Sequence, residues 1–180
     1  MKIVPVSEIP LSKPVPENFD LNKLWAITEE MAQVCLKEDG IGLHSCQTGG
    51  EYDLFIVNQK ATIPSMKEDK FYRYFNCSYE PDFNGVDFKD GTDLKIQVKS
   101  TEGCLSLNTP TEKRYFEVMR HRRVIVKGKI LKQNPFSGKI TASDVSGDWE
   151  GLAGIVFQHE IDHGKGVLIS DIGMEVHIYG

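Results

Sequence analysis

The residues of this 180-residue chain with the clearest chemical potential are His159, Glu160 and His163, which lie in the segment HEIDH. On an α-helix, positions i and i+4 share one face, so both imidazoles can reach a single metal ion. The Glu160 carboxylate would then face the open side of that ion. The segment therefore predicts a site that makes hydroxide from water at neutral pH.

Cys104, in the segment EGCLS, is a candidate third ligand. A free cysteine is most often a small buried apolar side chain, but this one follows a predicted strand and a glycine, where its thiolate could face a cavity. Two histidines and one cysteine leave one coordination position open, as in catalytic zinc sites. The long separation between Cys104 and His159 excludes a compact zinc-finger-like knuckle.

The segment GIGLHSCQ, residues 40–47, is a candidate substrate-binding loop. A helix end followed by a strand start would need only one glycine. Gly40 and Gly42 therefore suggest backbone that approaches a substrate closely, and Gln47 offers a side-chain N–H to a developing oxyanion. This segment taken alone leaves both interpretations open.

Length and composition favour one domain over residues 1–180 that is soluble, not secreted and therefore cytoplasmic. The net charge of −5 and the short basic run 120–123 disfavour nucleic-acid binding, which needs a concentrated cationic face. The sequence shows neither a membrane-length apolar stretch nor a signal-peptide pattern. Its four cysteines have no paired spacing, so we expect them to be reduced.

The expected elements are a proline-rich extended arm over residues 1–17, a helix that Asp20 caps and that ends near Gly40, several strands and a final helix. Strands are predicted over residues 52–57, 71–79, 94–98, 122–130 and 139–145, the last two joined as a hairpin.

The final helix, residues 149–164 with Asp148 as its cap, should carry the HEIDH segment. Its apolar residues and the two histidines recur at helical spacing, so we expect them to form one stripe that faces the core. Buried imidazoles need partners, which a metal would supply. The stripe consists of Leu152, Ile155, Val156, His159 and His163.

Three segments together resemble peptide deformylase: G-I-G-L-x-x-x-Q from Gly40, E-G-C-L-S from Glu102 and Q-H-E-x-D-H from Gln158. The resemblance covers scattered blocks between Gly40 and Leu168, with divergent sequence between them. It implies a hydrolase that removes the formyl group from the N-terminal formylmethionine of new polypeptides. It also implies an α+β fold, in which antiparallel β-sheets surround the central helix that carries HEIDH, with one long helix near the N-terminus.

The resemblance also implies roles for the matched residues. Glu160 would be the general base and later the acid, while Gln47 and the backbone N–H of Leu105 would stabilise the oxyanion. The implied metal ligands are Cys104, His159 and His163. The resemblance implies that these residues bind one divalent metal ion. Members of the family typically use Fe(II), and Zn(II), Ni(II) or Co(II) can also occupy the site.

On the substrate side, Gly42 would hydrogen-bond the peptide backbone, and Arg120 matches an arginine near the rim of the pocket. The resemblance also implies that Glu102 and Gly103 contact the substrate. Glu102 and Asp162 in addition resemble groups that orient metal ligands. The implied pocket for the methionine side chain consists of Ile41, Leu152, Ile155 and Val156.

The chain departs from the family pattern G-x-G-L-A-A-x-Q at His44 and Ser45, which replace two alanines. For His44 we favour a surface or hydrogen-bonding histidine over an extra ligand. The chain stops 17 residues after His163, which argues against ribosome docking through a long C-terminal extension and resembles divergent members, including those of bacterial viruses.

Two alternative functions remain. A zinc endopeptidase would share only H-E-x-x-H and would explain neither Cys104 nor Gln47. An inactive metal-binding relative would rest only on the changes at His44 and Ser45. We expect a monomer that acts on N-formylated nascent peptides, with a transient ribosome contact at most and with no nucleic-acid or membrane partner.

Overall fold

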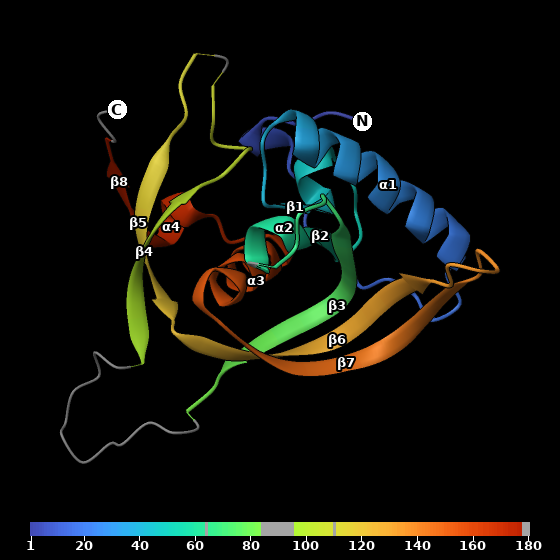
Figure 1. Ribbon diagram of the computed structural model, residues 1–180. Coiled ribbons are helices and arrows are strands. Elements are labelled where there is room, and N and C mark those ends of the chain that lie inside the picture. The colour runs from blue at the N-terminus through green and yellow to red at the C-terminus, as the bar shows by residue number, and fades with distance from the viewer. Residues whose placement is uncertain (64, 84–95, 110, 178–180) are drawn as a thin grey trace.

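The computed structural model describes residues 1–63, 65–83, 96–109 and 111–177. Two antiparallel sheets lie on either side of helix α3 (Gly151–Gly164), which carries the HEIDH segment (Figure 1). The predicted α+β fold with antiparallel sheets is confirmed. No helix in the described ranges is long and apolar enough to cross a membrane.

The larger sheet has the strand order β1-β2-β3-β6-β7, and each neighbouring pair is antiparallel. Strand β2 is completely buried, as its uninterrupted apolar run predicts. Strand β1 is at the edge of the sheet. The strands are β1 (Gly42–His44), β2 (Leu54–Asn58), β3 (Phe71–Pro81), β6 (Arg123–Gln133) and β7 (Ile140–Glu150).

The smaller sheet has the order β4-β5-β8, so β4 is also an edge strand. Its strands are β4 (Gln97–Gly103), β5 (Tyr115–His121) and β8 (Met174–Val176). The short helical segments in the described residues are η1 (Val6–Glu8), η2 (Ser45–Thr48), α2 (Gln59–Thr62) and α4 (Ile169–Ile172).

Helix α1 (Leu21–Lys37) confirms the predicted N-terminal helix. The Asp20 carboxylate accepts a hydrogen bond from the backbone N–H of Asn22 and so satisfies one free donor of the first turn. Leu24 and Met31 on its apolar face are completely buried, and they pack in one cluster with Leu43 of β1. This packing fixes the loop of residues 38–41 that leads into β1.

Helix α3 differs from its prediction in two respects. Asp148 lies in β7, and the residue that precedes the helix is Glu150, whose side chain makes no capping hydrogen bond. The predicted stripe does not face the core as a whole, since Leu152 is 47% exposed. Val156 of the stripe does face the core, together with Phe157 and Ile161. These three residues pack with Phe55, Tyr74 and Val124 of the larger sheet.

The other predicted strands correspond to β2, β3, β6 and β7, with shifted ends. The strand predicted over residues 94–98 lies partly outside the described residues, and β4 extends beyond it to Gly103. Strands β5 and β8 were not predicted. In β5 a buried position is occupied by the charged Arg120, which breaks the apolar alternation in the sequence. Strand β8 has only three residues, and its pairing with β5 joins distant segments, so local sequence carries little signal of either strand.

Candidate metal centre

Three side chains come together at one point: two belong to α3, and the third follows β4. The Nε2 atom of His163 lies 3.2 Å from Nε2 of His159 and 3.3 Å from the Sγ of Cys104. All three ligand atoms lie within 4.8 Å of one another. One turn of helix brings the two rings together, and Cys104 arrives at the end of β4.

The chemistry of this donor set fits a divalent metal ion. Burial on its own lowers the pKa of His159, but its hydrogen bonds with Cys104 and Glu102 raise that pKa well above its usual range. The point between the three donors therefore attracts positive charge. Burial also lowers the pKa of His163 well below its usual range, which keeps that ring neutral, the form that binds metals. Two imidazoles and a thiol suit zinc or iron.

A buried network of ion pairs supports the ligands from behind. The Nδ1 of His159 donates to the carboxylate of Glu102 over 2.9 Å, and Arg120 donates two hydrogen bonds to the same carboxylate. Arg120 also donates a hydrogen bond to the Asp162 carboxylate over 2.5 Å, and that carboxylate accepts a second one from the hydroxyl of Tyr79. Such partners fix the ring orientation of a metal-binding histidine.

The expected position of Arg120 near the pocket rim is wrong. Its side chain is only 2% exposed, and its guanidinium lies between Glu102 and Asp162. A buried guanidinium can be accommodated only where carboxylates neutralise it, and here two do so. Arg120 therefore holds the two carboxylates behind the ligands and does not line the cavity.

The Glu102 carboxylate should make the stability of the metal-free protein sensitive to acid. Burial would raise its pKa, but hydrogen bonds from Arg120 and His159 outweigh burial and lower it to about 2. Because the folded-state pKa is lowered from 4.5, the stabilisation is complete above pH 4.5 and disappears as the pH falls toward 2. Urea unfolding at a series of pH values should show the difference between wild type and Glu102→Gln shrinking over that range. A difference that stays constant would contradict this assignment.

Glu160 lies against the ligands with its carboxylate almost fully buried. Burial, and to a lesser degree the nearby Glu102 charge, raise the pKa of Glu160 to about 7. Its Oε2 has no hydrogen-bond partner among the described residues. The carboxylate also touches Gly42, where a Cβ atom would lie 2.4 Å from Oε1. A carboxylate so placed can exchange a proton with a group in the cavity.

Gln47 reaches the centre from η2. Its amide oxygen accepts the backbone N–H of His44 over 2.8 Å, which leaves the amide nitrogen directed at Ser106, 3.2 Å away, and at Cys104, 3.6 Å away. The backbone N–H of Leu105 has no acceptor in the described part of the chain. Two N–H groups beside the ligands form the kind of arrangement that stabilises an oxyanion.

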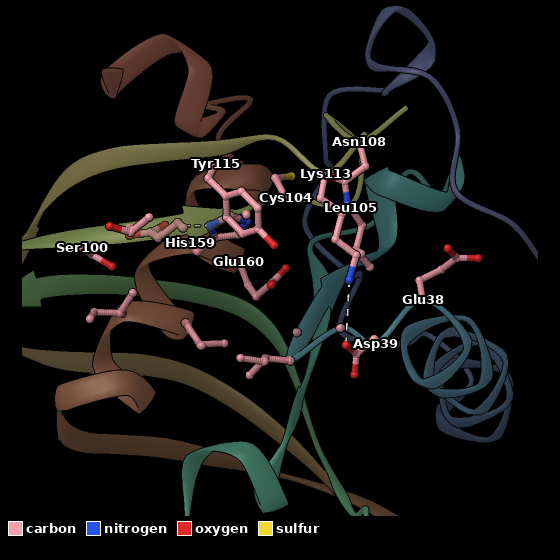
Figure 2. Close-up of a pocket in the computed structure, with 18 of the residues that line it drawn as sticks. Glu38, Asp39, Ser100, Cys104, Leu105, Asn108, Lys113, Tyr115, His159 and Glu160 are labelled. Carbon is pink, nitrogen blue, oxygen red and sulfur yellow. Dashed lines mark hydrogen bonds and ion pairs between the residues drawn. The ribbon is translucent and has the colours of Figure 1, made fainter. Parts of the chain in front are cut away.

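A cavity of about 290 Å³ opens in front of the ligands (Figure 2). It brings together most of the residues that the sequence singles out, and the exposed side of the predicted α3 stripe forms one of its walls. Arg120 and the deeply buried His163 are not part of its lining. The predicted residues that line it are Ile41, Gly42, Gln47, Glu102, Gly103, Cys104, Leu105, Leu152, Ile155, Val156, His159 and Glu160.

Other lining residues were missed by the sequence reasoning. Tyr115 lies close to the ligand group, and the Lys113 amino group lies 3.9 Å from the Asp39 carboxylate at the opening (Figure 2). No motif marks these residues, because they reach the cavity only through the pairing of β4 with β5 and through the loop after α1. The other missed lining residues are Glu38, Ser100, Thr101 and Asn108, whereas Gly40, which also lines the cavity, belongs to the predicted segment of residues 40–47.

Comparison with known proteins gives a consistent result. The family model described as polypeptide deformylase matches residues 2–175. A peptide deformylase of Thermodesulfovibrio yellowstonii is 32% identical over 154 residues, which cover 86% of this chain and 74% of that protein. One from Thermus thermophilus is 29% identical over 150 residues, or 83% of this chain and 69% of the relative.

Solved structures show the same fold. A probable peptide deformylase from Synechococcus phage S-SSM7 superposes with a TM-score of 0.65 at 24% identity and covers 94% of this chain and 97% of its own. At that identity the likeness concerns the fold alone. The peptide deformylase of Thermotoga maritima, at 29% identity, has a TM-score of 0.60 and covers 92% of this chain and 89% of its own.

Proposed function

The chain belongs to the polypeptide deformylase family, and from that membership we propose that it hydrolyses the formyl amide of N-terminal formylmethionine and releases formate. The observation that carries the proposal is the convergence of Cys104, His159 and His163 beside the buried carboxylate of Glu160. The family match does not favour an endopeptidase or an inactive relative, and every residue that the chemistry needs is present.

Cys104, His159 and His163 would hold one divalent ion, with Fe(II) proposed in the cell and Zn(II), Ni(II) or Co(II) as substitutes. When bound, such an ion supplies a water whose pKa is lowered from about 15.7 toward 7. Glu102 and Arg120 keep the His159 ring in the orientation that ligation needs.

Glu160 would accept a proton from the attacking water and later donate it to the amine that leaves. A pKa near the working pH suits both steps, since the group must take and return the proton in one turnover. Because the carboxylate is held against Gly42, it lies beside the strand edge where a substrate backbone would bind.

The amide of Gln47 and the backbone N–H of Leu105 would stabilise the oxyanion that forms at the formyl carbon. The methionine side chain would occupy the part of the cavity formed by Ile41, Leu152, Ile155 and Val156. An unbranched, flexible thioether fits a pocket lined in this way by aliphatic groups.

Release of formate tests the proposal. Protein loaded anaerobically with Fe(II) should release formate from formyl-Met-Ala-Ser, and it should release no acetate from the acetylated peptide. Metal analysis of the same preparation should find one ion per chain. Absence of formate from protein that contains its ion would refute the proposed function.

Replacement of Gln47 with alanine should lower kcat by about 10²–10³-fold, the usual effect of losing one oxyanion donor. KM should change little, because the oxyanion exists only in the transition state. Steady-state kinetics on the formylated tripeptide measure both constants. A mainly KM effect would instead assign Gln47 to ground-state binding.

We further propose that residues 1–180 act as one catalytic, monomeric domain on nascent chains, without nucleic-acid or membrane partners. The protein would act in the cytoplasm of a bacterium, or of the bacterial host if a virus encodes it, where translation begins with formylmethionine. Any contact with the ribosome would be transient.

A further inference from the structure

His44, one of the two departures from the family motif, lies in a fully built hydrogen-bond network. Its side chain is completely buried. The Nδ1 atom accepts the backbone N–H of Cys46 over 3.2 Å, which leaves Nε2 as the protonated nitrogen, 3.2 Å from the Asp53 carboxylate. Of the two alternatives that the sequence left for His44, a surface or a hydrogen-bonding histidine, the structure shows the second.

The network belongs to the short helix η2, whose first residue follows His44 and which carries Gln47. The backbone N–H of His44 holds the oxygen of the Gln47 amide, while the ring of His44 holds the next backbone N–H of the same turn. Both ends of His44 thus fix this single turn. With its oxygen held in this way, the Gln47 amide has its nitrogen directed at Ser106 and Cys104.

Other contacts tie the same turn to the rest of the fold. Ser45, the second departure from the motif, donates its hydroxyl to the backbone oxygen of Tyr52, directly before Asp53. The backbone N–H of Val4 donates to the carbonyl of Gln47. At the end of α3, a Cβ atom on Gly164 would lie 2.9 Å from the Asp53 carboxylate and 3.1 Å from the His44 ring. The histidine–aspartate pair therefore packs against the helix turn that carries His163.

We propose that His44, anchored by Asp53, is a positioning residue that directs the side-chain amide of Gln47 at the reacting formyl group. The inference rests on the proposed function, and it explains why a large polar residue is tolerated where the family motif has alanine. Two competing roles fit less well. His44 is not part of the ligand cluster, so it does not bind the metal. Cys46, two residues further on, is buried outside the cavity lining, so His44 has no thiol to activate as a nucleophile.

The first test is His44→Ala in the metal-loaded enzyme. The Gln47 amide should then stabilise the oxyanion less well, so kcat on formyl-Met-Ala-Ser should fall about tenfold with little change in KM. In a Gln47→Ala background the same substitution should have no further effect on kcat, because the amide that it positions is gone. An equal fall in both backgrounds, or an unchanged kcat, would overturn the proposal.

A second readout does not depend on activity. The side-chain amide signals of Gln47, assigned by their loss in Gln47→Ala, should shift or broaden in the NMR spectrum of metal-free His44→Ala protein. Unchanged signals would overturn the proposal even if kcat fell. If His44→Ala does not fold, Asp53→Ala can replace it, because the Asp53 side chain is partly exposed. This variant should show a smaller fall in kcat and a smaller change in the Gln47 amide signals.

Thr28→Ala provides a matched control, because Thr28 is a completely buried polar residue of α1 remote from the cavity. It should lower the Tm but leave kcat and the Gln47 signals unchanged. Since wild-type activity is measured in parallel, inactive wild-type protein would mark failure of the proposed function, whereas active wild type with an unaffected His44→Ala variant would mark failure of this inference alone.

Discussion

Glu160→Gln protein is expected to turn over formyl-Met-Ala-Ser about 10²–10⁴-fold more slowly than wild type while retaining its metal ion. The expected size is that of a lost general acid–base group. Glutamine keeps the shape of the side chain against Gly42, but its amide cannot take the proton of the attacking water or return it to the amine. Formate release and metal content, measured on one preparation, give both quantities.

Glu150→Gln is the matched control for this variant. Glu150 directly precedes the same helix, but its carboxylate is 70% exposed and faces Arg123, away from the cavity. It should retain wild-type kcat. If Glu160→Gln were nearly as active as wild type with its ion in place, Glu160 could not be the proton-transfer group, and another residue of the cavity would have to be sought.

Arg120→Met is expected to reduce the free energy of unfolding by about 3–5 kcal/mol, the usual cost of removing one partner from a buried ion pair. The substitution preserves much of the side-chain volume but leaves Glu102 and Asp162 buried without their cation. Urea unfolding at pH 7 measures the change. Affinity for the metal should fall as well, because Glu102 would no longer be held against His159.

Arg114→Met serves as the control for Arg120. Arg114 also makes two hydrogen bonds to one carboxylate, that of Glu175, but this pair is exposed to water. Solvent screens such a pair, so its loss should hardly change the unfolding free energy. Equal effects of the two substitutions would show that the carboxylates around Arg120 find other partners.

The parts of the site that could be predicted from the sequence are those that depend on local spacing. The pair His159 and His163 lies one helical turn apart, and Asp20 starts a helix by a local hydrogen bond. Cys104 could be proposed because it follows a predicted strand and a glycine and because the segment EGCLS resembles the family. In these cases chemistry and geometry are encoded within a few residues.

The parts that could not be predicted depend on which segments meet in space. The sequence gives no sign that Arg120 turns inward, because its two carboxylate partners lie 18 and 42 positions away. Tyr115 reaches the cavity only through the register of β5 against β4. The α3 stripe was assigned to the core because an apolar pocket wall and a core face have the same periodicity.

The two edge strands have a consequence for when the enzyme can act. Strand β1 ends the larger sheet, β4 ends the smaller one, and residues of both line the cavity. The carbonyl of Ile41, directly before β1, accepts the backbone N–H of Asn58, and the carbonyl of Gly42 accepts the Cys35 thiol over 3.6 Å. On this edge the N–H of Gly42 is therefore the backbone group that a peptide would meet. A peptide can join such edges only as an extended strand with its own backbone groups unpaired. A chain whose first residues have already formed a helix or hairpin offers no such groups, so removal of the formyl group has to precede folding of the newly made N-terminus.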